Sequence, residues 1–359
     1  MQLPTAYVST PRVLVAGQPQ PGLSADVISV LVEETVEGLY RCEARIYNYG
    51  LQANSGRYLY LGRDIIDFGA DFAVHMGQDD RASQVFNGRI SAIEAEYPSG
   101  GGGLLTVLAE DRLQGLRMTR RTRTFEETSD ADVIRQIAAE HSLEPQVSLP
   151  ESPVHKVLAQ VNQSDLAFIR ERARSLNAEL WVEDRSLFVK ARTDRMDTVI
   201  ILAYEDNLIS FSVRADLAHQ CTQVGVAGWN VAAKDAIEVE ATENAIRAEL
   251  SDNDISGSSI LQQAFGERQE RIVHTAPLTD EEARGIAAAR YCERARHFVT
   301  GTGITDGDAR IRVGSVVKLE GLGNLFNGNY YVSRVRHSYD STYGFRTTFD
   351  VERPGIGQP

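Results

Sequence analysis

The chain has 359 residues, of which 42% are hydrophobic and 24% are charged. This composition is typical of a globular protein with about two or three domains. Acidic residues outnumber basic ones by 50 to 37, which gives a formal charge of −13. A polyanion would be repelled by such a chain, so we expect no specific nucleic-acid binding.

The cysteines and the amino terminus indicate where the protein is made. Cys42, Cys221 and Cys292 are far apart and have no paired spacing, which argues against a disulfide framework or a zinc ribbon. The first residues lack the basic and then apolar layout of a secretion signal, and no window approaches the roughly 18 apolar residues of a membrane helix. We therefore expect cytoplasmic synthesis without a signal peptide, and no direct membrane insertion.

Residues 1–110 are predicted to form a mostly β first domain. Apolar residues alternate with a period of two, as in Val13 and Val15, which is typical of strands with one buried face. The Asn87-Gly88 pair predicts a tight hairpin turn, because both residues tolerate the positive φ that such a turn requires. A second turn is predicted at Ser99 to Gly103.

Residues 111–199 are predicted to form a small α/β domain. Ser129 with Asp132 resembles a capping box, and it predicts a helix that ends near Ser142. A second helix begins after Asn162 or Ser164, either of which is suited to cap it. Its predicted apolar face is Leu166, Ile169, Ala173 and Leu176, and Arg170, Glu171, Arg172 and Arg174 are expected to be mostly solvated. The β-type runs 180–182 and 187–189 then predict a short hairpin.

Residues 200–359 are predicted to form a second β domain with an inserted helix around 278–298. Thr279 opens this helix with a capping box, and its apolar stripe is Ala283, Ala287, Tyr291, Ala295 and Phe298. The polar segment from Ala241 to Ile272 is predicted to be an excursion outside the core. Phe345, Thr347, Phe349 and Val351 are predicted to share one face of the last strand. The fold class is thus mainly β, with two β-rich parts flanking an α+β insert.

The residues that carry chemistry in enzymes show no typical spacing here. The histidines lack zinc-site spacing, and no nucleophile elbow, phosphate loop or dinucleotide fingerprint follows a strand. The segment from Gly301 to Asp308 is predicted to be a turn rather than a ligand site. The basic run of Arg117, Arg120, Arg121 and Arg123 is predicted to pair with acidic groups rather than with phosphate. We therefore expect no catalytic residue, cofactor or metal.

Several stretches together resemble the late control D family of phage baseplate hubs and the related amino-terminal half of VgrG spike proteins. The first is Phe86 to Ile90 followed by Leu105 to Leu113, and the second is Arg123-Thr124-Phe125 before a helix. The third comprises Gln160, Ser164-Asp165, Phe168 and Arg172. The fourth runs from Asp280 to Arg296 and continues through Gly314 to Gly321, Phe326 to Val332 and His337. Gln163 stands where VgrG proteins usually carry Glu, which favours the phage-like or injection-particle branch.

The resemblance implies a non-catalytic homotrimeric hub, made in the bacterial cytoplasm and assembled into a phage tail or injection particle. Two tube-protein-like barrels per subunit would give a pseudo-sixfold ring that joins the tail tube protein to a trimeric spike protein, among other baseplate proteins. Since the chain ends soon after Arg353, we expect the spike to be a separate polypeptide. The expected interface residues are Arg170, Arg174, Tyr291, Phe298, Phe345, Thr347 and Phe349. Two alternatives stay open, a tail-associated cell-wall hydrolase and a carrier of an effector or spike that forms no tube junction.

Overall fold

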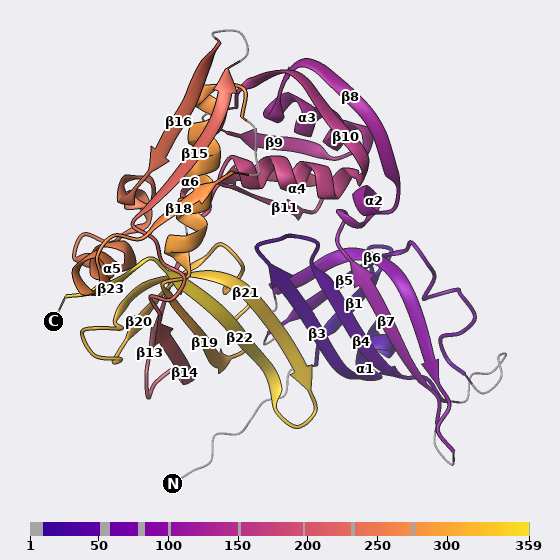
Figure 1. Cartoon of the computed structure of the whole chain (residues 1–359). Coiled ribbons are helices and arrows are strands. Elements are labelled where there is room, and N and C mark those ends of the chain that lie inside the picture. Colours follow the sequence, from indigo (N-terminus) through magenta and orange to yellow (C-terminus); the bar gives the residue numbers. More distant parts are fainter. Residues whose placement is uncertain are drawn as a thin grey trace.

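The computed structural model describes residues 10–50, 58–77, 83–99, 102–149, 152–196, 198–230, 234–273 and 277–358. Strands dominate both ends of the chain, and a unit of helices and short sheets lies between them (Figure 1). The predicted fold class, mainly β with an α+β insert, is confirmed. Within the described residues, no helix combines the length and the apolar character needed to cross a membrane.

The first β part is an antiparallel sheet whose inward side chains form one hydrophobic core. Alternation builds this core: Val30 and Val32 of β3 point inward, as do Cys42, Ala44 and Ile46 of β4. The elements are β1 (Arg12–Val15), β2 (Gln18–Pro19), α1 (Pro21–Ala25), β3 (Val27–Thr35), β4 (Arg41–Tyr47), β5 (Asp71–Met76), β6 (Ser83–Glu96) and β7 (Leu104–Glu110).

The predicted hairpin turn at Asn87-Gly88 is wrong. Strand β6 passes straight through both residues, which pair with Ala73 and Phe72 of β5. A Cβ atom on Gly88 would lie 2.2 Å from the carbonyl oxygen of Glu110, so the glycine permits a close backbone approach rather than a turn. The turn expected at residues 99–103 falls between β6 and β7, and Gly100 and Gly101 of it lie outside the described residues.

The last β part contains β13 (Val199–Ala203), β14 (Leu208–Ala215), β19 (Val299–Asp306), β20 (Val316–Glu320), β21 (Gly328–Asp340) and β22 (Gly344–Arg353). The turn predicted from Gly301 to Asp308 is wrong, because β19 occupies most of that segment. A Cβ atom on Gly303 would lie 2.3 Å from the ring of Phe349, so this glycine makes room for a core aromatic side chain. Glycine here serves packing between neighbouring strands.

One sheet runs through both β parts. Strand β21 pairs antiparallel with β3, with Val335 opposite Glu34 and His337 opposite Val32. Among the described residues, the resulting sheet has 13 strands in the order β14-β19-β22-β21-β3-β4-β7-β6-β5-β1-β2, and β20 and β13 branch from β21. Figure 1 shows the indigo and yellow strands meeting at this pair. The first and last β parts are therefore joined by backbone hydrogen bonds.

The insert packs two helices against short sheets. A ribbon of β8 (Arg120–Ser129) and β10 (Val154–Ser164) arches over α3 (Asp130–Glu140) and α4 (Asp165–Ser175), which follow the short helix α2 (Gln114–Arg117). A second sheet has the order β11-β12-β9, from Ala178–Glu183, Ser186–Ala191 and Glu144–Ser148. Ser129 and Ser164 cap the two helices through their hydroxyl groups, as predicted. The predicted hairpin is β11 and β12.

A second core lies within the last part of the chain. Helix α6 (Asp280–Arg296) packs on β15 (Gln223–Asn230), β16 (Asp235–Ala241) and β18 (Gln269–Ile272). The Ala283, Ala287, Tyr291 and Ala295 side chains of its predicted stripe are buried there, whereas Phe298 follows the helix and packs in the core of the last β part. The excursion predicted for residues 241–272 is wrong, because Ile246 and Leu261 are buried and α5 (Gly257–Phe265) forms within it. The domain boundaries at residues 110 and 199 remain predictions.

Candidate functional site

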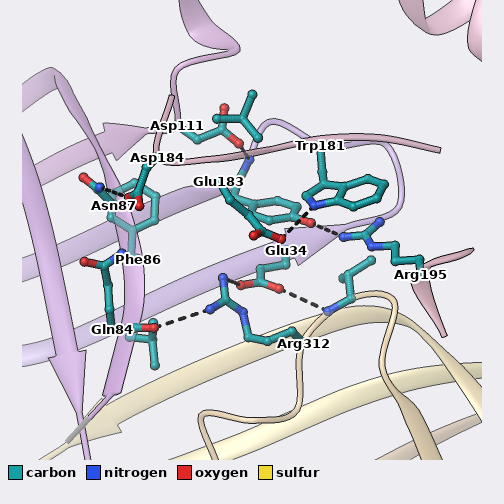
Figure 2. A pocket seen from close by; sticks show the side chains of 14 residues that line it. Glu34, Gln84, Phe86, Asn87, Asp111, Trp181, Glu183, Asp184, Arg195 and Arg312 are labelled. Carbon is teal, nitrogen blue, oxygen red and sulfur yellow. Dashed lines mark hydrogen bonds and ion pairs between the residues drawn. The ribbon is translucent and has the colours of Figure 1, made fainter. Parts of the chain in front are cut away.

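Buried charges gather where the insert meets the two β parts, and we call this region the junction. It comprises the cavity of Figure 2 and the ion network around Glu179. The described residues contain no group of histidine, cysteine, aspartate and glutamate side chains placed to hold a metal ion. The contacts at the junction are ion pairs and hydrogen bonds.

The cavity of about 330 Å³ has walls from three parts of the chain. Strands β3 and β6 contribute Glu34 and Asn87, the insert contributes Trp181 and Asp184, and the segment before β20 contributes Arg312 (Figure 2). The Asn87 amide donates to the Asp184 carboxylate at 2.6 Å, which links β6 to the turn between β11 and β12. Side chains far apart in sequence thus close around one small polar space.

Glu34 anchors the last β part to the first. Its side chain is 1% exposed, forms an ion pair with Arg312, and accepts a hydrogen bond from the Val313 backbone at 3.1 Å. Arg312 also donates to the carbonyl of Gln84 on β6 at 3.4 Å. Because Glu34 continues the inward series of Val30 and Val32, the period-two pattern contained a signal for this buried carboxylate that our sequence analysis missed.

Asp111 links the first β part to the insert. One carboxylate oxygen accepts from the Tyr40 backbone at 2.7 Å, and the other accepts from the Leu113 backbone at 2.9 Å. Burial raises the pKa of Asp111 to about 7, despite these two bonds and the nearby Arg170 guanidinium. The opposite shift occurs at His337 on β21, where burial and the Arg312 charge lower the pKa to about 3.

These two groups are expected to give opposite pH dependences. The pKa of Asp111 is higher in the folded than in the unfolded chain. Its contribution to the free energy of unfolding is therefore lost as pH rises through about 7. His337 has a folded pKa below its unfolded value of about 6.5, so its contribution is lost as pH falls below about 6.5. Between pH 7 and pH 5 each group changes the free energy of unfolding by roughly 2 kcal/mol. The two changes have opposite signs and nearly cancel.

The measurement is urea unfolding at pH 7 and pH 5 for the wild type, Asp111→Asn and His337→Gln. Acidification should destabilise Asp111→Asn and stabilise His337→Gln, each by roughly 2 kcal/mol relative to the wild-type change. The change in the free energy of unfolding between the two pH values is compared for each protein. Any loss of stability that a substitution causes equally at both pH values cancels in this comparison. Parallel pH profiles for all three proteins would contradict the assignment.

The ion network around Glu179 joins all three parts of the chain. Glu179 accepts from Arg192 and from Arg195, each at 2.9 Å, and from the hydroxyl of Tyr331. Burial alone would raise the pKa of Glu179, but the two guanidinium groups offset it and hold that pKa below its usual value. Arg195 also donates to the Tyr40 hydroxyl at 2.7 Å and stacks 4.0 Å from the Trp181 ring centroid. Sequence reasoning missed this network, whose members lie in three separate segments.

A second charged cluster surrounds Asp165 at the start of α4. Its carboxylate, 1% exposed, lies 3.0 Å from Arg123 and 2.8 Å from His141, and it accepts from Gln160 at 2.9 Å. Gln160 and Asp165 belong to the stretch that carried the family resemblance. The hydrogen bond between them holds β10 against the start of α4. The predicted pairing of the basic run is confirmed for Arg121 and Arg123, which both contact Glu140.

Several residues that were expected to be solvated or to lie at an interface are less exposed in the structure. Arg172 is only partly exposed, because it forms an ion pair with the buried carboxylate of Asp130. Among the expected interface residues, four are packed inside this chain and are at most 2% exposed, which corrects their proposed role: Tyr291, Phe298, Thr347 and Phe349. Phe345 and Arg170 are half-buried, whereas Arg174 is exposed and pairs with Glu37 at 2.8 Å.

Comparisons with known proteins agree with this architecture. The family model described as the Alg8 N-terminal domain matches residues 5–341. The 43 kDa tail protein of prophage MuSo2 from Shewanella oneidensis aligns with a TM-score of 0.67 and 13% identity, over 96% of this chain and 98% of that one. The tail protein of Neisseria meningitidis MC58 aligns with a TM-score of 0.66 and 12% identity, over 97% of both chains.

A third solved structure is an Escherichia coli component of the type VI secretion system, described as structurally similar to T4 bacteriophage tail proteins. It aligns with a TM-score of 0.60 and 11% identity, over 97% of this chain and 79% of that one. No curated protein sequence matches the chain. At these identities the likeness establishes a shared fold along nearly the whole chain.

Proposed function

The chain belongs to the Alg8 N-terminal domain family, and from its fold we propose that it is a structural subunit of a phage-type tail or contractile injection particle. In this proposal three copies form a ring that joins the tail tube protein to a spike protein and contacts other baseplate proteins. A relationship to late control D and VgrG hubs is part of the proposal, since the matching family model is that of the Alg8 N-terminal domain.

The observation that carries the proposal is the continuous sheet formed by two β parts of one chain. Strands β3 and β21 hold the parts side by side, so three copies would supply six such parts around a ring. Such a ring offers sixfold-like contacts to a tube and threefold contacts to a spike. A rigid connection between the parts suits an element that transmits force.

The buried carboxylates support a structural rather than a catalytic role. Asp130, Asp165 and Glu179 are each held by arginine or histidine side chains, and Glu34 is held by Arg312. A general acid or base must reach a proton on a bound substrate. These four carboxylates are each paired with a cationic side chain inside the chain, which suits them poorly to that task.

We place the contact between copies at the outer edge of the last β part. Within the described residues β14 pairs only with β19 and β13 only with β20, apart from a single bridge between Tyr204 and Leu208. Val199 and Ile201 on β13 are 57% and 56% exposed, and Ile209 on β14 is 48% exposed. Unpaired strand edges beside exposed aliphatic side chains are sites where further strands or subunits pack.

Native mass spectrometry of the purified chain, with and without the tail tube protein, tests the proposal. Wild type should form trimers, and Val199→Lys with Ile201→Lys should shift the population to monomers, because buried lysine charges disfavour the contact. Val157→Lys is the matched control, since Val157 on β10 is equally 57% exposed and lies in the insert. Monomers alone at high concentration, with no ring in electron micrographs, would overturn the ring.

A further inference from the structure

A second cavity, of about 470 Å³, lies between the first β part and the insert, and we call it the basic cleft. Its charged lining comes from Arg89 on β6, Arg112 after β7 and Arg185 in the turn between β11 and β12. Its lining residues all belong to the described part of the chain, and none of them carries a carboxylate. Three guanidinium groups thus converge on one cavity in a chain of net charge −13.

The acidic groups near the basic cleft do not neutralise it. Asp71 lies 3.5 Å from Arg89 and 3.2 Å from Arg112, so one carboxylate that is itself 49% exposed serves two guanidinium groups. Arg185 donates to the carbonyl of Ser142 at 3.1 Å, which supplies no charge. A surplus of positive charge therefore remains on the lining.

Two other ionisable groups near the basic cleft are already engaged. His141 lines the cavity, but its Nε2 atom is committed to Asp165 at 2.8 Å. Glu110, which lies opposite Arg89 across the β6 and β7 pair, forms its own ion pair with Arg117. A negative charge brought from outside would meet three arginines that, within the described residues, share only one carboxylate, that of Asp71.

The rim of the basic cleft is apolar. Phe68 is 59% exposed and Met118 is 74% exposed, and both line the cavity. Arginine combined with aromatic and methionine side chains is the composition that protein interfaces favour. A bare inorganic anion would make no use of these two side chains, and a nucleic acid would be repelled by the net charge.

We propose that the basic cleft binds an acidic segment of a partner protein, with a carboxylate at the arginines and an apolar neighbour on Phe68 and Met118. Charge-assisted hydrogen bonds from guanidinium groups to a carboxylate supply orientation and specificity. In the described part of the chain, the lining contains no residue of β13 or β14, and occupation of the cleft requires no ring. The inference therefore goes beyond the proposed function and stands or falls separately from it.

Fluorescence anisotropy with a fluorescein-labelled peptide of alternating glutamate and leucine tests the proposal on the full chain. Wild type should bind this peptide and should bind the glutamine and leucine counterpart at least about tenfold more weakly. Arg185→Glu should weaken binding by about tenfold, and Arg112→Gln should act in the same direction. Phe68→Ser should weaken it by roughly threefold through the lost apolar contact.

The matched control is Arg271→Glu, which makes the same charge change at a residue whose side chain is 61% exposed and pairs with Glu238 on β16. It should leave binding within roughly twofold of wild type. Three results would overturn the proposal: equal binding of the glutamine peptide, an equal loss in Arg271→Glu, or full displacement by inorganic phosphate with no effect of Phe68→Ser. The last would show a free-anion site, and thermal melts would confirm that each variant is folded.

Discussion

Replacing Glu179 by glutamine is expected to lower the free energy of unfolding by about 3–5 kcal/mol, the cost of breaking a buried ion pair from one side. Glu179 is 8% exposed and is the shared partner of Arg192 and Arg195. Arg192 retains an ion pair with Glu352 at 2.8 Å, but Arg195 would keep only the Tyr40 hydroxyl and the Trp181 ring. A buried guanidinium without a carboxylate is the state that the substitution creates.

The measurement is urea unfolding followed by tryptophan fluorescence, because Trp181 lies against the Arg195 side chain. The matched control is Glu238→Gln, whose ion pair with Arg271 joins two side chains that are both more than half exposed. An exposed pair contributes about 0–1 kcal/mol, so this variant should unfold close to the wild-type midpoint. Similar small losses in both variants would show that the junction is not held by Glu179.

The helices of the insert could be predicted from the sequence because their signals are local. Ser164 accepts from the Ala167 backbone at 3.2 Å, and Leu166, Ile169 and Ala173 are buried as the three-and-four spacing predicts. Caps and periodic faces depend on neighbours within one or two turns. The same locality explains why the hairpin of β11 and β12 was predicted correctly.

The junction could not be predicted in the same way, because its contacts join distant segments. Glycine after asparagine is typical of a turn. At Gly88, however, glycine is required because the backbone of Glu110 on a neighbouring strand lies so close. Glu179 meets Tyr331 from 152 positions away. The sequence pattern offers the buried aromatic residues Tyr291 and Phe349 as interface candidates, because an apolar strand or helix face has the same periodicity whether it covers its own core or a partner.

Replacing Ile169 by aspartate should cost at least about 4 kcal/mol, because it places an unpaired charge among apolar side chains. Ile169 is 0% exposed within the core that also contains Leu116, Ile134 and Val189. Helix α4 lies on α2, α3, β10 and β11, so it is the element around which the insert is packed. Loss of its apolar face should therefore unfold the insert as a unit.

Circular dichroism melts of Ile169→Asp and of Ala167→Asp distinguish the two faces of α4. Ala167 is exposed on the first turn of the same helix, where a negative charge interacts favourably with the helix dipole, so its variant should melt near wild type. Hydrogen exchange should then show lost protection in residues 120–190 of Ile169→Asp alone. If both variants melt like wild type, the apolar face of α4 does not hold the insert, and the ion pairs of Asp165 and Asp130 must fix the helix instead.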